Sequence, residues 1–155
     1  MLQLSDKIAL FMEGHLQSDY GKMGFGVLRY AKNEIVAVVD SQFTGQDLAE
    51  ITGIPHQAPI VDSIEESKKK GANVLIIGIS PSGGRIPQDW LLLIEAAVKT
   101  GMSVVNGLHD LFSQRFQDLC QGKNQWIWDV RVPQTTPPIA TAKAAALPNK
   151  RILFV

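Results

Sequence analysis

The 155-residue chain has the length of one ordinary domain, which can bury about 70% of its unfolded surface without disulfides or metals. Fifteen lysines and arginines balance fifteen aspartates and glutamates, so no net positive charge favours nucleic acid or an anionic membrane. Small molecules and protein surfaces are therefore the expected partners. The single cysteine, Cys120, cannot form an internal disulfide, and its apolar helical surroundings predict a buried thiol.

The amino terminus lacks a basic segment followed by a long apolar core, and no apolar run reaches the length of a membrane-spanning helix. We therefore expect a cytoplasmic protein that does not bind a membrane. Three histidines and one cysteine are scattered without ligand spacing, so no metal site is expected.

Five short, nearly all-apolar runs predict strands that are buried on both faces, as in a parallel sheet. Two weaker runs, 59–61 and 126–130, are further strand candidates. Helical segments alternate with these runs, which predicts βαβ crossovers on both sides of one sheet. The expected fold is α/β: a Rossmann-like, mostly parallel, doubly wound sheet in three layers, α/β/α. The five runs are 8–12, 35–39, 74–79, 102–105 and 152–155.

A short, exposed helix is expected after residue 63. Ser63 and Glu66 have the spacing of a capping box, in which each side chain bonds a free backbone amide of the other. Gly71 can end this helix in a left-handed conformation.

Two longer helices follow. Pro87 and Gly101 frame the first of them. Its apolar run 90–94 covers more than one helical face, so we expect it to pack against something beyond its own sheet. The second, 108–120, has one apolar and one polar side and is expected to lie on the surface.

The composition changes over residues 131–148, where prolines bracket a short alanine-rich helix. We interpret residues 1–148 as a Rossmann-like domain that ends in this linker. Residues 149–155 lead into a run typical of a buried strand with nothing after it, which suggests a fragment of a longer protein.

Polar residues follow most of the predicted strands, at the edge where open parallel sheets form their ligand crevice. The loop 80–85 leads into a helix amino terminus, where unpaired amides and the helix dipole favour an anion. Gly83 and Gly84 allow close backbone approach, and Arg85 can hold a phosphate or carboxylate by two hydrogen bonds. A plain glycine-rich turn with a solvated arginine is the alternative. The candidate substrate- or anion-binding residues are Asp40, Ser41, Ser80, Ser82, Gly83, Gly84, Arg85 and Arg131.

Asp40 ends the second predicted strand, where a dinucleotide-binding domain places the acid that binds a ribose hydroxyl. The first βα turn, however, lacks the G-x-G-x-x-G pattern, since Gly21, Gly24 and Gly26 come well after the strand. We interpret these glycines as allowing a helix to pack closely on the sheet. NAD(P) binding is kept as the less favoured alternative.

The candidates for proton transfer are His109, Asp110 and Glu13. His109 and Asp110 follow a strand, where a histidine can act as acid or base; alternatively, Asp110 caps the next helix and His109 bonds locally. Glu13 lies beside His15, and either group can tune the pKa of the other, although loop solvation explains them as well. Asp129 and Arg131 are expected to form a structural ion pair, with Arg131 also a candidate for substrate binding.

Four segments in this order make a specific resemblance that covers nearly the whole chain: 28–41, which contains EIVAVVDS; 77–87, IGISPSGGRIP; 107–110, GLHD; and 127–131, IWDVR. They resemble a long uncharacterised bacterial and archaeal two-domain family that includes D-glutamate (D-amino-acid) N-acetyltransferases. The resemblance implies a Rossmann-like domain followed by a P-loop domain, whose first strand would end at Val155.

The resemblance further implies that the full-length protein is an acyltransferase that uses acetyl-CoA through the P-loop domain, and that this domain alone is inactive. It implies that the candidate residues form part of an interdomain cleft. We hypothesise that Arg85 or Arg131 holds a substrate carboxylate while His109 or Glu13 takes a proton from the attacking amine.

Two other functions are considered beside the transferase. One is an NAD(P)-binding oxidoreductase-type domain. The other is a non-catalytic regulatory or oligomerisation module of a P-loop NTPase-like protein, with the run 90–94 as its interface. A homo-oligomer is expected.

Overall fold

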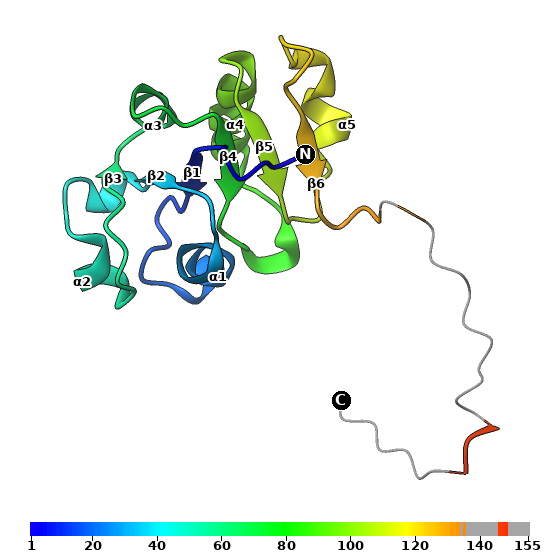
Figure 1. Cartoon of the computed structure of the whole chain (residues 1–155), viewed down its shortest axis with the longest axis horizontal. Coiled ribbons are helices and arrows are strands. Elements are labelled where there is room, and N and C mark those ends of the chain that lie inside the picture. Colours follow the sequence, from blue (N-terminus) through cyan, green and yellow to red (C-terminus); the bar gives the residue numbers. More distant parts are fainter. Residues whose placement is uncertain (134, 136–145, 149–155) are drawn as a thin grey trace.

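The computed structural model describes residues 1–133, 135 and 146–148. Its six strands form one sheet in the order β3-β2-β1-β4-β5-β6, and every neighbouring pair is parallel (Figure 1). The chain builds β1 to β3 in one direction, then crosses back and builds β4 to β6 in the other, as in doubly wound folds. The predicted Rossmann-like sheet is confirmed. The strands are β1 Ile8–Phe11, β2 Ile35–Val39, β3 Ile60–Val61, β4 Val74–Ile77, β5 Ser103–Asn106 and β6 Ile127–Asp129.

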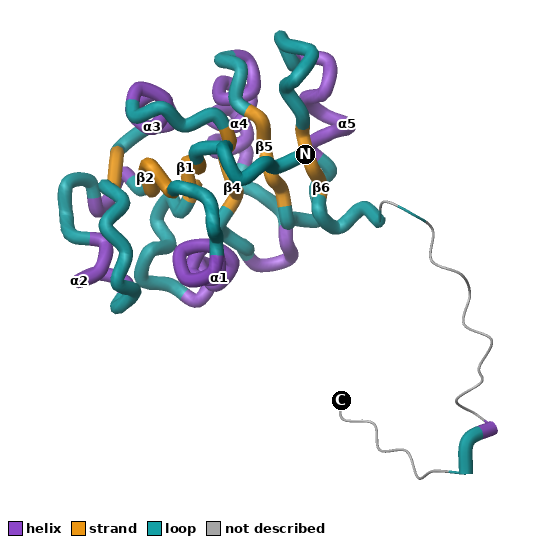
Figure 2. Tube along the Cα trace, viewed as in Figure 1, coloured by secondary structure: helices purple, strands orange, loops and turns teal. Residues whose placement is uncertain are grey.

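Helices alternate with the strands and cover both faces of the sheet (Figure 2). Met12 lies against Gly24 of α1, whereas the Phe11 ring meets Trp90 of α4 edge-to-face, with 5.9 Å between ring centroids. Successive side chains of an extended strand point to opposite faces, so α1 and α4 lie on opposite sides and the fold has three layers. The helices are α1 Lys22–Tyr30, α2 Leu48–Thr52, α3 Ile64–Lys69, α4 Gln88–Lys99 and α5 Phe112–Phe116.

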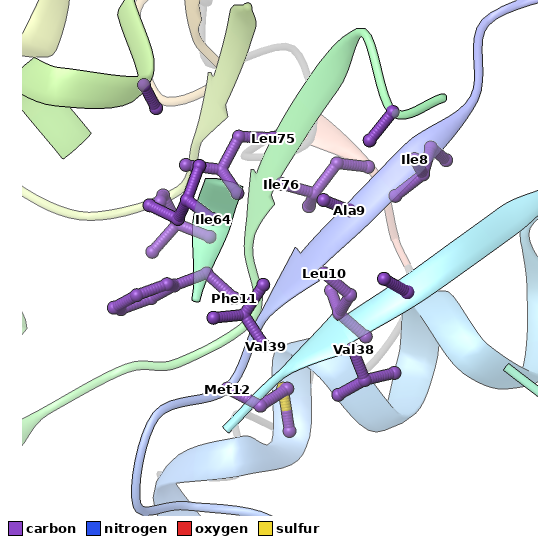
Figure 3. Packing of buried hydrophobic residues seen from close by; sticks show 14 of the residues in the cluster. Ile8, Ala9, Leu10, Phe11, Met12, Val38, Val39, Ile64, Leu75 and Ile76 are labelled. Carbon is purple, nitrogen blue, oxygen red and sulfur yellow. The ribbon is translucent and has the colours of Figure 1, made fainter. Parts of the chain in front are cut away.

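The core is centred on β1 and β4, in which every side chain is buried. Leu10 and Met12 point to the face that carries Val38, while Phe11 points to the other face toward Ile64 (Figure 3). Burial of these apolar strands on both faces is the main force that holds the sheet. The same burial explains why their sequences are continuous apolar runs and do not alternate.

The glycines of the α1 segment allow the close packing that the sequence predicts. Gly24 donates its amide to the Gly78 carbonyl at 2.7 Å, so the helix touches the backbone that follows β4. A Cβ at Gly24 would overlap the Met12 side chain. α1 is therefore held against the sheet at a separation that only glycine permits.

The predicted ends of α3 are confirmed. The Ser63 hydroxyl accepts a hydrogen bond from the Glu66 amide at 3.3 Å, and Gly71 has a φ of 94° after the helix. The capping box is formed only in one direction, because the Glu66 carboxylate pairs with Lys69.

α5 is shorter than the expected helix 108–120, since it begins at Phe112 and gives way to the 3₁₀ turn Gln117–Leu119. Cys120 is only partly buried and packs against the core. Partial burial raises the pKa of its thiol.

The apolar run of α4 covers two helical faces, as predicted. Leu91 and Ile94 are buried against the sheet, whereas Leu92 is 58% exposed and Leu93 is 42% exposed. The described residues therefore leave part of the apolar surface of α4 exposed.

The alanine-rich part of the predicted linker and the predicted strand 152–155 lie outside the described residues. None of the helices that the structure describes combines the length and the apolar character needed to cross a bilayer.

Candidate functional site

The carboxyl ends of the strands form one edge of the sheet, here called the carboxyl edge. β1 and β4 are neighbours in the sheet, yet the chain leaves them toward helices on opposite faces. In doubly wound folds this divergence opens the ligand crevice. The loop after β1 carries Glu13 and His15, and the loop after β4 carries the residues from Ser80 to Arg85.

Glu13 connects the loops that follow β1 and β2. One oxygen of its carboxylate accepts a hydrogen bond from the Ser41 amide at 2.9 Å, and the other accepts from the Ser41 hydroxyl at 2.5 Å. Both carboxylate oxygens are thus engaged by Ser41. None of the ion pairs among the described residues includes Glu13.

Asp40 is completely buried beneath this contact. Its Oδ1 accepts from the Gln42 amide at 3.1 Å, whereas the buried Oδ2 has no hydrogen-bond partner among the described residues. Burial raises the pKa of Asp40, and nearby Glu13 adds to the rise, while the amides of Gln42, Gly14 and Leu16 offset it in part. The carboxyl group therefore faces the loop after β1 and has no surface on which to meet a ribose.

His15 lies where the loop after β1 meets α4. Its Nδ1 is 2.8 Å from the Ser18 hydroxyl. The imidazole ring packs edge-to-face against Trp90, in the first turn of α4, and against Tyr20, with 5.5 Å between ring centroids in both pairs. The sequence places His15 at the carboxyl edge, but no local pattern pairs it with Trp90.

The loop after β4 forms a 3₁₀ turn at Ser82–Gly84, in which Gly83 and Gly84 have φ values of 75° and 65°. The Ser80 amide donates to the Tyr20 carbonyl at 2.8 Å, which connects this loop to the segment that carries His15. Ser80, Ser82 and Arg85 are exposed. No side chain caps the amino terminus of α4 that follows.

His109 and Asp110 fasten the loop after β5 to the loop after β4. The His109 amide donates to the Gly84 carbonyl at 2.9 Å, and the Ile86 amide donates to Oδ2 of Asp110 at 3.2 Å. The expected alternative in which Asp110 caps the next helix is wrong, because α5 begins after Leu111 without a cap from that side chain. The His109 ring lies over Gly84, where a Cβ would overlap it.

The expected ion pair between Asp129 and Arg131 is not among those of the described chain. Asp129 is buried and accepts hydrogen bonds from the Asn106 side chain at 2.7 Å, from the Phe112 and Ser113 amides at 2.9 Å, and from the Ser113 hydroxyl. Burial alone would raise the pKa of Asp129, but these hydrogen bonds outweigh it and hold the pKa below its usual value. Asp129 thus caps α5 from the neighbouring strand.

The candidate residues form two connected groups. Glu13, Asp40 and Ser41 lie over β1 and β2, whereas the loop after β4 is joined to His109 and Asp110 over β4 and β5. The segment of His15 and Tyr20 links the two groups through Ser80. Arg131 is exposed after β6, and none of the ion pairs among the described residues joins it to either group.

Residues 41–133 match the profile of a family described as a domain of unknown function (DUF1611_N), a Rossmann-like domain. The chain belongs to the DUF1611_N family. The predicted family resemblance is confirmed, and the DUF1611_N match extends from Ser41, just after β2, to just beyond β6.

Three known proteins are similar to this DUF1611_N chain. A D-glutamate N-acetyltransferase of a Pseudoalteromonas species is 37% identical over 95 residues, 60% of this chain and 28% of the relative. A D-glutamate N-acetyltransferase of Tritonibacter scottomollicae is 34% identical over 80 residues, 50% of this chain and 24% of the relative. The crystal structure of a DUF1611 family protein from Anabaena variabilis superposes with a TM-score of 0.84 at 40% identity, covering 95% of this chain and 43% of that one.

The aligned parts correspond to about a quarter of the length of these two enzymes, 28% and 24%. The DUF1611_N chain also spans less than half of the solved relative.

Two surface hollows of the DUF1611_N domain, about 540 and 550 Å³, lie at the opposite edge of the sheet. Asp6 and Asn73 line the first of them and bond to each other at 2.9 Å. Asn73 also accepts from the Lys7 amide, and Asp6 accepts from the Gln3 amide. These polar groups already bond to protein, so we place the candidate site at the carboxyl edge.

The described residues contain no group of three or more His, Cys, Asp or Glu side chains that could hold a metal ion.

Proposed function

We propose that this chain is the Rossmann-like domain of an N-acetyltransferase that acts on a D-amino acid, with D-glutamate as the first candidate. The observation that carries this proposal is the match between the family domain and two relatives named D-glutamate N-acetyltransferase. The chain covers about a quarter of each relative. We therefore propose for the full-length protein both a P-loop domain, which binds acetyl-CoA, and the complete transferase activity.

The carboxyl edge is proposed as one wall of a cleft between this domain and the P-loop domain. Three features support this assignment. The neighbouring strands β1 and β4 diverge there, the amino terminus of α4 has no side-chain cap, and the side chain of Arg85 is exposed beside it. A guanidinium at a helix amino terminus suits a substrate carboxylate, because the guanidinium and the helix amides are all hydrogen-bond donors.

An acetyl-transfer assay tests the proposal directly. The full-length protein, given acetyl-CoA and D-glutamate, is expected to release the free thiol of coenzyme A, and L-glutamate is expected to react more slowly. Arg85→Ala should raise the KM for glutamate more than it lowers kcat, as should Arg131→Ala if that residue holds the carboxylate. Arg29→Ala, in the last turn of α1, is the matched control.

Either arginine variant can thus identify the carboxylate ligand. If both arginine variants keep the wild-type KM, the carboxylate is held elsewhere. If the wild-type protein releases no thiol with either enantiomer, the transferase proposal is wrong.

An NAD(P)-binding domain is the alternative that the strand order favours, because the order is that of dinucleotide-binding folds. The burial of Asp40 weighs against it, since the carboxyl group has no exposed surface. A thermal-shift panel with NAD, NADP, ATP, acetyl-CoA and both glutamate enantiomers separates the two functions, because a ligand that binds the folded state stabilises it. A shift with NAD alone would favour the oxidoreductase-type domain.

We also propose a cytoplasmic protein with a small-molecule substrate, no nucleic-acid or membrane partner, and a homo-oligomeric state. The exposed Leu92 and Leu93 of α4 support an interface there. If the domain is instead a non-catalytic oligomerisation module, its mass will rise with concentration while none of the ligands in the panel binds. Sedimentation of the wild type and of Leu92→Lys distinguishes an α4 interface from association elsewhere.

A further inference from the structure

His15 is held in one orientation from three directions. The loop after β1 supplies its backbone, and the Ser18 hydroxyl lies at its Nδ1 atom. The rings of Tyr20 and Trp90 pack edge-to-face with the imidazole, at interplanar angles of 81° and 86°. These contacts join a loop of β1 to the first turn of α4. The imidazole is therefore fixed between the two loops that diverge at the carboxyl edge.

The second ring nitrogen, Nε2, is available to a ligand. It forms no hydrogen bond within the described chain, and it is not among the buried polar atoms that lack a partner. Because Nε2 is neither hydrogen-bonded nor fully buried, a ligand can reach it from solvent. Nε2 is thus an accessible polar atom, on a ring that lies between the two loops, and no hydrogen bond of the described chain uses it.

The Ser18 hydroxyl can accept a hydrogen bond from a proton on Nδ1 of this imidazole. Its hydroxyl oxygen accepts from the Tyr20 amide at 3.3 Å, and a hydroxyl has a second acceptor lone pair for an Nδ1–H donor. A proton on Nδ1 leaves the lone pair on Nε2, which is the form that acts as a base.

We infer that His15 is the proton acceptor of the proposed site, with Ser18 as its positioning residue; this inference rests on the proposed N-acetyl transfer. The ammonium group of the amino acid gives one proton to Nε2. The neutral amine then attacks the carbonyl carbon of the acetyl thioester, so that a C–N bond forms and the C–S bond breaks. The imidazolium returns its proton to the departing thiolate, and the new amide nitrogen releases its second proton to water.

The geometry favours His15 over the two acceptors that the sequence suggests. Both carboxylate oxygens of Glu13 accept hydrogen bonds from Ser41, so this group already joins two loops of the fold. His109 is exposed, and no side chain of the described residues hydrogen-bonds its ring. Of these three candidates, His15 alone combines an anchored ring nitrogen with an unpaired one.

The proton position can be measured without any substrate. In protein labelled with ¹⁵N at histidine, long-range proton–nitrogen correlations show which ring nitrogen carries the proton. His56 is an internal reference of the opposite kind, because its Nδ1 accepts from the Ala58 amide at 3.1 Å and its proton must lie on Nε2. We expect the Nδ1–H form for His15, and Ser18→Ala should reduce it. An Nε2–H form in the wild type would overturn the inference.

Kinetics on the full-length protein provide the second test. His15→Ala is expected to lower kcat for acetyl transfer about 10²- to 10⁴-fold with a smaller change in the KM for D-glutamate, and added imidazole should restore part of the rate. His56→Ala should keep the wild-type kcat. Ser18→Ala should lower kcat less than His15→Ala.

The outcomes separate this inference from the proposed function. A wild-type protein that transfers no acetyl group would contradict the proposed function. An active wild type whose His15 variants keep kcat would contradict the inference alone. If His15→Ala does not fold, as judged by circular dichroism, His15→Gln replaces it, since glutamine keeps a polar side chain at this position.

Discussion

The Glu13 carboxylate accepts two hydrogen bonds from a single residue, Ser41, one from its amide at 2.9 Å and one from its hydroxyl at 2.5 Å. Because Glu13 follows β1 and Ser41 follows β2, the pair fixes the two loops relative to each other. Asp40 lies directly beneath, with its carboxyl group facing the loop after β1. The pair therefore supports the loop after β1, which also carries His15.

A double-mutant cycle tests this support. Glu13→Gln and Ser41→Ala are each expected to lower the free energy of unfolding by about 1 kcal/mol, the usual contribution of a hydrogen bond. The double variant should lose less than the sum, because both changes remove the same contact. Urea denaturation measures the three values, and strictly additive losses would show that the two residues act independently.

Gly84 is expected to be more sensitive to substitution than its neighbour Gly83. Both residues have positive φ values, but a Cβ at Gly84 would overlap the His109 ring, whereas a Cβ at Gly83 meets nothing within 4 Å. Gly83→Ala should cost about 1–2 kcal/mol for the left-handed backbone, and Gly84→Ala should cost more. Thermal or urea unfolding provides the comparison.

The same pair of variants can identify the cause of the larger loss. Adding His109→Ala to Gly84→Ala should bring its stability close to that of Gly83→Ala, since the overlapping ring is gone. Equal losses in the two single variants would mean that His109 moves away without resistance.

Two glycines of α1 are expected to respond in opposite directions. A Cβ at Gly24 would overlap Met12 and lie 3.1 Å from the Gly78 carbonyl, whereas a Cβ at Gly26 meets nothing within 4 Å. Gly24→Ala should destabilise the fold by about 1–3 kcal/mol through overpacking. Gly26→Ala should stabilise it by about 0.5–1 kcal/mol, because alanine is the better helix former. A stable Gly24→Ala variant would show that α1 can move outward.

The features that sequence predicts well here are those set by neighbours along the chain. The apolar run 35–39 coincides with β2 because burial on both faces excludes polar residues from a central strand. Ser63 caps α3 because its partner, the Glu66 amide, is three residues away. Gly24 marks close packing because only glycine fits at that position.

The features that sequence misses depend on contacts between distant segments. The start of α5 is set by Asp129, which comes from β6, so no pattern within residues 108–120 reveals it. The same contact explains why the expected Asp129–Arg131 pair is absent, since the carboxylate is already used. The meeting of His15 and Trp90 requires the strand order of the sheet. That order places β4 beside β1 and so brings α4 to the loop after β1.

Asp129 is expected to stabilise the fold at neutral pH and to lose this effect in acid. Its pKa is lower in the folded state than the usual 3.8, so folding favours the charged form. Asp129→Asn should lower the free energy of unfolding by about 1–3 kcal/mol at neutral pH, because donors on α5 lose a charged acceptor. The difference from wild type should shrink as the pH falls below about 4.

Urea denaturation over a range of pH measures this difference. Asp118→Asn is the matched control, since Asp118 is exposed near the end of the same helical segment and its loss should change stability by less than about 0.5 kcal/mol. A difference between wild type and Asp129→Asn that stays constant into acid would contradict the role of the charge.

Asp40 should give a pH dependence of the opposite sign. Its pKa is raised in the folded state, mainly by burial, so the folded chain binds a proton more tightly than the unfolded chain. The contribution of Asp40 to stability is therefore complete below the usual pKa of 3.8 and is lost as the pH rises through the raised value. Asp40→Asn removes this titration, so its stability relative to wild type should increase from about pH 3 to about pH 7. A relative stability that decreases over this range would mean that the amides of Gly14 and Leu16 hold the charged form more strongly than burial opposes it.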